Sequence, residues 1–260
     1  MSRRLNAAPG GAGGHAGGHG PAGASAVSVV TVTWNNAAGL RQTLASLAAL
    51  QHRPLEVVIV DGGSTDGTEA VVGEYAGQLA LSYSSEPDEG IYEAMNKGHR
   101  RCGGALVHYL NAGDTVFGEP YAAAAQPCLL PVRVHDAEGR YFFDEFVRFG
   151  GRAYCHQGIL FPVAHPDYDT KYRIAADLDL MLACFPGGLE RLPKVKGGGV
   201  RFDQGGVSTR AAATQTHEFL AVFRCRLPRG EALGLYAYLQ VKRFIPQALR
   251  RAIVGWRHGR

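Results

Sequence analysis

The sequence lacks the features that mark several large classes of protein. Its 260 residues contain no apolar run near the roughly 18 to 20 residues of a spanning helix, and the first residues lack the apolar core of a signal peptide. The five cysteines are widely spaced and form no CxxC pair, so the sequence predicts neither a disulfide framework nor a zinc ribbon. We expect a cytoplasmic protein with reduced thiols.

Acidic residues are missing from the end of the chain. Residues 241–260 hold six Lys or Arg and no Asp or Glu, which leaves 21 basic and 23 acidic residues in the first 240, a net −2. The overall charge of +4 therefore belongs to a tail. Apolar and aromatic residues alternate with these charges, and Pro246 should kink or split the helix. This pattern favours a basic amphipathic helix on an anionic membrane surface, although its apolar face could instead pack on the domain. No nucleic-acid motif accompanies the charges, so we expect no nucleic-acid partner.

The hydrophobic share of 46% is enough for a buried core, and the pattern divides the chain into three parts. Residues 1–25 are rich in Gly, Ala, His and Pro, which predicts a flexible leader. Residues 26–210 form the predicted domain, with a first half at 26–114 and a second half at 115–210. Residues 211–260 form the predicted helical and basic C-terminal segment.

Strand and helix patterns alternate in the first half. Apolar, β-branched runs that read as strands lie at residues 27–33, 55–60, 79–84 and 105–110. Helical patterns lie between them, near residues 40–47, up to about Tyr75, and from about Ile91 to Cys102. This order predicts an α/β fold with a mostly parallel sheet, flanked by helices and joined by right-handed crossovers. Residues 115–153 are too irregular to assign.

Polar clusters follow each predicted strand, at residues 33–36, 61–66, 86–89 and 111–114. In open parallel sheets, ligands bind at the carboxyl ends of the strands. Asp61, Asp88 and Asp114 would repel a bare phosphate, but a nucleotide diphosphate bridged by a divalent cation suits them. The alternative for Asp61 and Asp66 is turn and capping chemistry.

Five ordered blocks carry a resemblance to a known family. They lie at residues 29–36, 61–68, 86–98, 110–114 and 172–177. Together they resemble the family 2 glycosyltransferases, and the third block resembles the subgroup that builds bacterial surface polysaccharides of the colanic-acid type. The resemblance covers about residues 27–210 and implies a GT-A fold, a nucleotide-sugar donor and inversion at the anomeric carbon. It also implies that residues 26–114 are the nucleotide-binding, or donor, half of the domain and that residues 115–210 are its acceptor and catalytic half.

The resemblance also implies roles for individual residues on the donor side. Thr33 would border the base, Asp61 would accept a hydrogen bond from base or ribose, and Asp88 would line the nucleotide. Asn35, Asn96 and Asn111 complete the expected nucleotide-binding set. Asp114 matches the last acid of the family's metal-binding triplet, which implies Mg²⁺ or Mn²⁺, but Ala112 stands where the first acid is usual.

Asp177 matches the family's general base, which takes the proton of the acceptor hydroxyl. Asp179 would point elsewhere on a helix, and the alternative for both is an acidic surface turn.

Three further assignments each stay open between two interpretations. His156 and Gln157 lie where an acceptor would bind, or His156 is a core histidine. Lys97 meets a phosphate, or is an exposed helical lysine. Gly206 and Ser208 belong to a loop that closes over the diphosphate, or to a plain turn.

The resulting hypothesis is an inverting, metal-assisted glycosyltransferase with a lipid-linked saccharide acceptor. It would act at the inner face of a bacterial plasma membrane in exopolysaccharide or envelope glycan synthesis. The alternatives are a nucleotidyltransferase, which should carry a glycine-rich basic loop after the first strand, and a degenerate sugar-nucleotide-binding protein.

Overall fold

The computed structural model divides the chain into two compact units, Met1–Thr209 and Arg210–Arg260. The structure describes residues 3–4, 26–135, 141–144, 152–203 and 212–243. The two units are described separately below.

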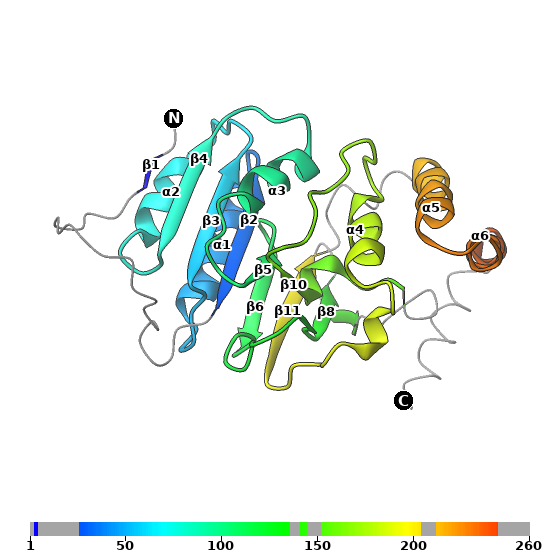
Figure 1. Cartoon of the computed structure of the whole chain (residues 1–260). Helices are drawn as coiled ribbons and strands as arrows, with labels where there is room; N and C mark the ends of the chain where they lie inside the picture. Colours follow the sequence, from blue (N-terminus) through cyan, green and yellow to red (C-terminus); the bar gives the residue numbers. More distant parts are fainter. Residues whose placement is uncertain (1–2, 5–25, 136–140, 145–151, 204–211, 244–260) are drawn as a thin grey trace, which may run out of the picture. The chain divides into compact units, whose positions relative to one another are not determined.

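The first half of unit Met1–Thr209 is a set of parallel strands joined by helices (Figure 1). The strands lie in the order β4-β3-β2-β5 and are β2 (Val27–Thr33), β3 (Glu56–Asp61), β4 (Leu81–Ser85) and β5 (Leu106–Tyr109). The connecting helices are α1 (Ala37–Ala48), α2 (Thr68–Tyr75) and α3 (Ile91–His99). The predicted alternation is confirmed, and α3 ends three residues before the predicted Cys102.

Three short strands extend this sheet at its two edges. β1 (Arg3–Arg4) pairs antiparallel with β4, so these two residues of the predicted leader belong to a strand, while residues 5–25 lie outside the described residues. β10 (Ile159–Pro162) pairs antiparallel with β5, and β7 (Cys128–Leu129) pairs antiparallel with β10.

A second sheet occupies much of the region that the sequence pattern leaves unassigned. Its order is β6-β11-β8-β9, with β6 (Thr115–Gly118), β11 (Gly198–Asp203), β8 (Val132–His135) and β9 (Tyr141–Asp144). β11 runs antiparallel to β6 and parallel to β8. Strands this short carry too few residues for a readable alternation, and their partners lie far away in the sequence.

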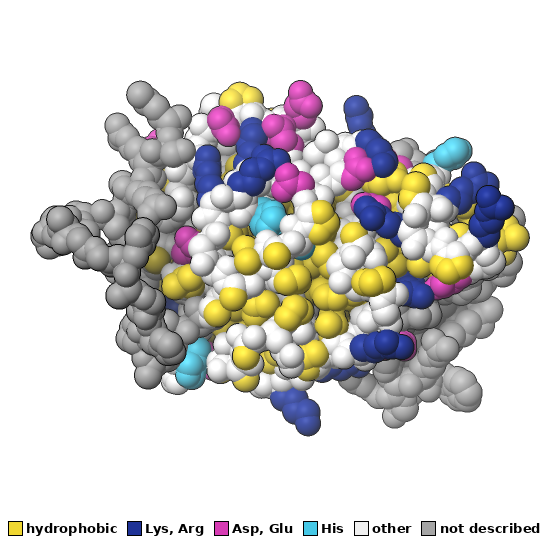
Figure 2. Space-filling model, in the orientation of Figure 1, with side chains coloured by type: hydrophobic (Ala, Val, Ile, Leu, Met, Phe, Trp, Pro, Cys, Tyr) yellow, Lys and Arg dark blue, Asp and Glu magenta, His cyan; other side chains and the backbone are white. Residues whose placement is uncertain are grey.

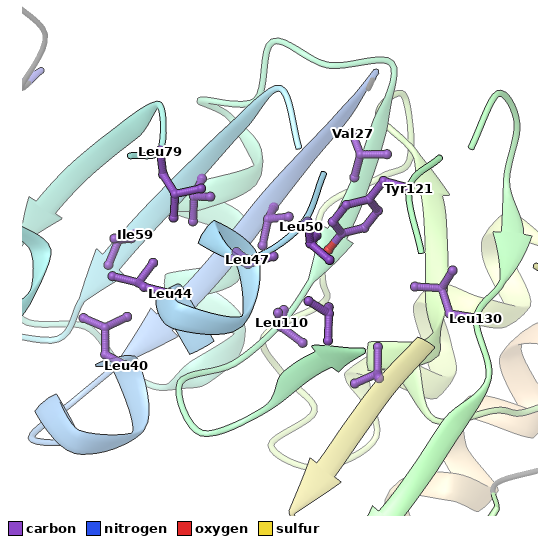
Figure 3. Close-up of a cluster of buried hydrophobic side chains, with 14 of the residues drawn as sticks. Val27, Leu40, Leu44, Leu47, Leu50, Ile59, Leu79, Leu110, Tyr121 and Leu130 are labelled. Atoms are coloured by element: carbon purple, nitrogen blue, oxygen red, sulfur yellow. The ribbon is translucent and has the colours of Figure 1, made fainter. Parts of the chain in front are cut away.

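The two faces of the large sheet are covered by different helices. Leu40, Leu44 and Leu47 of α1 join Val27 and Ile59 in a fully buried cluster on one face (Figure 3). α3 lies against the other face, where Gly98 approaches Val30 so closely that an added Cβ would lie 2.5 Å from its Cγ1. The sheet therefore lies between buried residues of α1 on one face and of α3 on the other.

Helix caps follow the polar residues that the sequence places after the strands. The Asn36 side chain accepts the Gly39 amide at 3.1 Å and caps α1. The N-cap of α2 is Gly67, which adopts a left-handed φ of 91° and supplies no side chain to cap the helix. Asp66, one residue earlier, accepts the Thr68 hydroxyl at 2.6 Å instead.

The remaining elements are short helices of unit Met1–Thr209 and two helices of unit Arg210–Arg260. The former are η1 (His156–Gly158), α4 (Ala176–Cys184) and η2 (Leu189–Arg191). In the latter, α5 (Ala212–Arg226) and α6 (Arg229–Arg243) pack against each other. Among the described residues, no helix is both long and apolar enough to cross a membrane. Pro246 and the rest of the basic tail beyond α6 lie outside the described residues.

Candidate active site at the carboxyl ends of the parallel strands

The four polar clusters predicted from the sequence meet at one edge of the sheet. Gly62 donates its amide to the Thr33 carbonyl at 2.9 Å, and Glu86 donates to the Asp61 carbonyl at 3.0 Å. On the other side, Ala112 donates to the Val32 carbonyl at 3.2 Å. Residues 33–36, 61–66, 86–89 and 111–114 therefore form a continuous surface, which we call the carboxyl rim (Figure 1).

The first two loops of the carboxyl rim are locked together by side chains. Asn35 adopts a φ of 47°, a left-handed conformation that Asn tolerates better than most residues. Its amide donates to Ser64 Oγ at 2.7 Å, and its Oδ1 accepts the Thr65 amide at 2.9 Å. The Thr68 hydroxyl and the Ala37 amide hold the pKa of Asp66 below its ordinary value. These contacts fix the loop shape in advance of any ligand.

Asp61 is fully buried beneath this loop. Its carboxylate accepts the Ser64 amide and hydroxyl at 3.1 and 2.5 Å, and the Tyr83 and Ser85 hydroxyls, both at 2.9 Å. Burial is the main reason that the pKa of Tyr83 rises to about 12, so Tyr83 remains a donor. Asp61 organises the carboxyl rim from within, and its contact with base or ribose stays a prediction.

Thr33 lies at the start of the same surface, where its hydroxyl is buried with no hydrogen-bond partner among the described residues. Trp34, which the candidate set omitted, is 69% exposed beside it. A Cβ on Gly62 would lie 3.3 Å from Trp34 Cδ1 and 2.8 Å from Asp88 Oδ2, so a side chain at this position would displace the Asp88 carboxylate. The signal in the sequence was a large aromatic residue directly after a buried strand.

Asn111 and Asp114 supply oxygen atoms at the far side of the carboxyl rim. Asp114 is 5% exposed, and its carbonyl accepts the Thr43 hydroxyl at 2.7 Å. Asn111 Oδ1 is buried with no hydrogen-bond partner in the described part of the chain. In the part of the chain that the structure describes, no group of three or more His, Cys, Asp or Glu could hold a metal ion. A carboxylate with a free amide oxygen still fits Mg²⁺ or Mn²⁺, ions that draw other ligands from water and diphosphate.

Two predicted site residues of α3 contact protein groups. Asn96 is buried, with its Nδ2 donating to the Tyr168 carbonyl at 2.9 Å and its Oδ1 accepting the Tyr168 amide at 2.8 Å. Lys97 Nζ donates to the Pro87 carbonyl at 3.1 Å and lies 3.3 Å from Glu93 Oε1. Figure 2 shows Lys, Arg, Asp and Glu side chains gathered at the upper edge of that view. Lys97 therefore lies beside the carboxyl rim and takes part in ion pairs there. The contacts of Asn96 and Lys97 with a nucleotide stay predictions.

His156 and Gln157 form the buried turn η1. Burial, with His108 nearby, lowers the pKa of His156 to about 4, so the ring is neutral at neutral pH. Its Nε2 has no hydrogen-bond partner among the described residues. The backbone carbonyl of Gln157 forms a hydrogen bond with His108 Nε2 at 2.6 Å. The structure places both residues in the core, where contact with an acceptor would require an opening.

Asp177 is the second residue of α4 and is partly exposed, whereas Asp179 is 5% exposed. Asp177 Oδ1 accepts the Leu178 amide at 2.7 Å. The segment before it is tied to α3, because the Tyr92 hydroxyl donates to the Ile174 carbonyl at 2.9 Å. Tyr92 lies in α3, four residues after Asp88 of the carboxyl rim. The helix α3 therefore contacts the rim loop and, through Tyr92, the segment that precedes Asp177. Gly206 and Ser208 lie outside the described residues.

The residues that form the carboxyl rim match a known protein family. Residues 28–119, which include all four loops of the carboxyl rim, match the model of the glycosyl transferase family 2. Residues 28–119 therefore carry a family 2 glycosyltransferase domain. The expected resemblance is thereby confirmed for the four ordered blocks that lie within these residues.

Relatives extend the similarity beyond this family 2 domain. The chain is 29% identical to a PGL/p-HBAD biosynthesis glycosyltransferase of Mycobacterium tuberculosis, over 90% of this chain and 98% of the relative. S. aureus TarS 1-349 in complex with UDP-GlcNAc has a TM-score of 0.62 at 17% identity, over 82% of this chain and 71% of that chain. The mannosyltransferase PcManGT of Pyrobaculum calidifontis, solved with GDP-Man and Mn²⁺, has a TM-score of 0.55 at 18% identity, over 89% and 74% of the two chains. The family 2 domain therefore has the expected GT-A fold.

Proposed function

We propose that this chain transfers a sugar from a nucleoside-diphosphate sugar to a saccharide acceptor, with inversion at the anomeric carbon. The observation that carries the proposal is the carboxyl rim, where loops from four strands are joined into one preformed surface. The solved relatives bind UDP-GlcNAc and GDP-Man, so these are the first donors to test.

The nucleotide would bind across the first three loops of the carboxyl rim. The exposed ring of Trp34 offers an apolar face for a base or a sugar. Asp88 Oδ2 lies beside it, and Asp88 Oδ1 accepts the Gly90 amide at 2.9 Å, which holds the carboxylate in place. Thr33, Asn35 and Asp61 support this surface from below, and Asn96 holds α3. Lys97 would meet the diphosphate if it released the Pro87 carbonyl.

The diphosphate would lie toward Asn111 and Asp114, with Gly206 and Ser208 closing over it. Asp114 and Asn111 Oδ1 would hold Mg²⁺ or Mn²⁺, which when bound would stabilise the negative charge that grows on the departing diphosphate. Because the methyl side chain of Ala112 cannot ligate a cation, the chain contributes few side-chain ligands. We expect a dependence on the metal that is looser than a carboxylate triplet would give.

Asp177 would act as the general base. As the acceptor oxygen bonds to C1, the bond from C1 to the diphosphate oxygen breaks on the opposite face, and the acceptor proton passes to the Asp177 carboxylate. The position of Asp177 in the first turn of α4 stabilises that carboxylate in its charged form. Asp179 is buried, so an acceptor would reach Asp177 more easily.

On the acceptor side we propose a lipid-linked saccharide at the inner face of a bacterial plasma membrane, with His156 and Gln157 near its binding site. Leu233 of α6 supports contact with a membrane, since it is 68% exposed and residues 241–260 hold six Lys or Arg. The mycobacterial relative belongs by name to PGL/p-HBAD biosynthesis, so acceptors of that class belong in the assay beside exopolysaccharide precursors.

The proposal is tested by incubating the purified full chain with UDP-GlcNAc, GDP-Man and other nucleotide sugars, Mn²⁺, and lipid-linked saccharides in vesicles. We expect release of one nucleoside diphosphate and a product whose anomeric configuration is opposite to that of the donor, as read by NMR. A retained configuration would refute the inverting mechanism. Donor binding without transfer to any acceptor would favour a degenerate sugar-nucleotide-binding protein.

A further inference from the structure

Residues 163–175 lead from β10 to α4 and form neither a helix nor a strand. We call them the connecting segment. It ends at Ala175, the N-cap of α4, two residues before Asp177. Backbone polar groups outside regular structure need other hydrogen-bond partners. The position of Asp177 therefore depends on the groups that hold the connecting segment.

Several of these groups lie on one face of α3. Tyr92, Asn96 and His99 are spaced by four and three residues, which places their side chains on the same side of the helix. The Asn96 side chain binds the amide of Tyr168 at 2.8 Å and its carbonyl at 2.9 Å. His99 Nε2 lies 2.7 Å from the Val163 carbonyl. The start and the middle of the connecting segment are thus bound to α3.

The Tyr92 hydroxyl binds the end of the connecting segment. It donates to the Ile174 carbonyl at 2.9 Å in a partly buried position. Ile174 directly precedes the N-cap Ala175, whose carbonyl accepts the Asp179 amide at 3.0 Å in the first turn of α4. The hydrogen bond of Tyr92 therefore fixes the backbone immediately before the turn that carries Asp177.

The same helix is also bound to residues 86–89 of the carboxyl rim. Asp88 Oδ1 accepts the amide of Gly90, the N-cap of α3, at 2.9 Å. Lys97 Nζ donates to the Pro87 carbonyl at 3.1 Å. Neither contact involves the Tyr92 hydroxyl. Loss of that hydroxyl should release the end of the connecting segment and leave this part of the carboxyl rim in place.

We propose that Tyr92 is a positioning residue for the transfer reaction, whose hydrogen bond to the Ile174 carbonyl sets the place of the Asp177 carboxylate relative to a donor on the carboxyl rim. This inference rests on the proposed function. A general base must lie within hydrogen-bond reach of the proton that it takes. A displacement of about 1 Å can lower the rate about a hundredfold, so kcat depends on where the first turn of α4 lies.

The test is Tyr92→Phe, which removes the hydroxyl and keeps the ring, whose centroid lies 5.3 Å from that of the Tyr168 ring. We expect kcat to fall about tenfold to hundredfold, because the base is displaced from the acceptor hydroxyl. The Kd of the donor, measured by calorimetric titration, should stay unchanged because the contacts of α3 with the carboxyl rim remain. A parental kcat in Tyr92→Phe would overturn the inference.

Tyr154→Phe is the matched control. The Tyr154 hydroxyl donates to the Leu130 carbonyl, also at 2.9 Å and also in a partly buried position. Both variants lose one hydrogen bond of the same kind and length, so their melting temperatures should fall by similar amounts. Only Tyr92→Phe should lower kcat. An equal loss of kcat in the two variants would show a general loosening of the fold and would contradict a positioning role.

A double-mutant cycle with Asp177→Asn tests whether Tyr92 acts through the base. In single-turnover assays with enzyme in excess, Tyr92→Phe should cause no further loss once Asp177 is replaced. A further loss as large as in the parent would mean that Tyr92 acts independently of Asp177, and the inference would be wrong.

The outcomes for the inference and for the proposed function differ. If Tyr92→Phe keeps the parental kcat while Asp177→Asn is strongly impaired, the inference is wrong and the proposed function stands. A parental chain that binds donors and transfers nothing would overturn both.

Discussion

The two halves of unit Met1–Thr209 differ in how far apart in the sequence their paired strands lie. Between residues 26 and 114, β2, β3 and β4 pair in sequence order, and each strand ends in a polar loop of the carboxyl rim. Between residues 115 and 203, β6 pairs with β11, which joins Thr115 to Arg201. The comparison indicates that the first half is built by local repetition, while the second half depends on contacts between distant segments.

The largest expected effect is a loss of catalytic rate from a substitution in the second half. Asp177→Asn removes the proposed base but keeps the shape of the side chain, so kcat should fall about 10²- to 10⁴-fold. Donor affinity should stay as in the parent, because the carboxyl rim is unchanged. Steady-state transfer assays and calorimetric donor titration measure the two quantities.

Asp169→Asn is the control for that experiment, since Asp169 lies nearby in the sequence and pairs with Lys171 at 2.5 Å on the surface. It should transfer at the parental rate. Equal activity of Asp177→Asn and Asp169→Asn would show that the acceptor half does not hold the base at this position.

An intermediate effect is a loss of stability from a substitution in the first half. Asp61→Asn removes a buried carboxylate that accepts four hydrogen bonds, so the free energy of unfolding should fall by about 1.5–3 kcal/mol. Asp88→Asn, at a partly exposed position, should change it by no more than about 0.5 kcal/mol. Urea unfolding followed by circular dichroism measures both. Equal values would mean that Asp61 does not organise the carboxyl rim.

The smallest expected effects are changes in stability, compared between a buried glycine of α3 and an exposed glycine of α2. Gly98→Ala places a Cβ against Val30 and should destabilise the chain by about 1–3 kcal/mol. Gly73→Ala, on an exposed position of α2 with nothing within 4 Å, should stabilise it by about 0.5–1 kcal/mol. A shift of the same sign in both variants would contradict the close packing of α3 on the sheet.

The sequence predicted the donor half well because its signals are local. β-branched runs such as Val29 and Val30 identify strands, and the turn residues after them identify the carboxyl rim. The same reasoning could not predict that Asn96 binds the backbone of Tyr168, because that contact joins residues 72 positions apart. It also left β6, β8 and β9 unassigned, since strands of four residues show little periodicity.

Among the site residues, the side-chain environment was the part that could not be predicted. Asp61 was expected to face the nucleotide, and the structure shows it satisfied by Ser64, Tyr83 and Ser85. The sequence pattern also does not show that Trp34 is 69% exposed. Burial of this kind depends on neighbours from other loops, which a linear pattern does not contain.

The central claim is that the carboxyl rim binds a nucleoside-diphosphate sugar together with a divalent cation. The most direct measurement is calorimetric titration of the folded full chain with UDP-GlcNAc and GDP-Man, each with Mn²⁺ and with EDTA. The account predicts saturable binding of one of these donors at one site per chain, weaker in EDTA and weaker again in Asp114→Asn with Mn²⁺. Absence of binding by either donor, and by the remaining nucleotide sugars, to a chain with a native circular dichroism spectrum would contradict it.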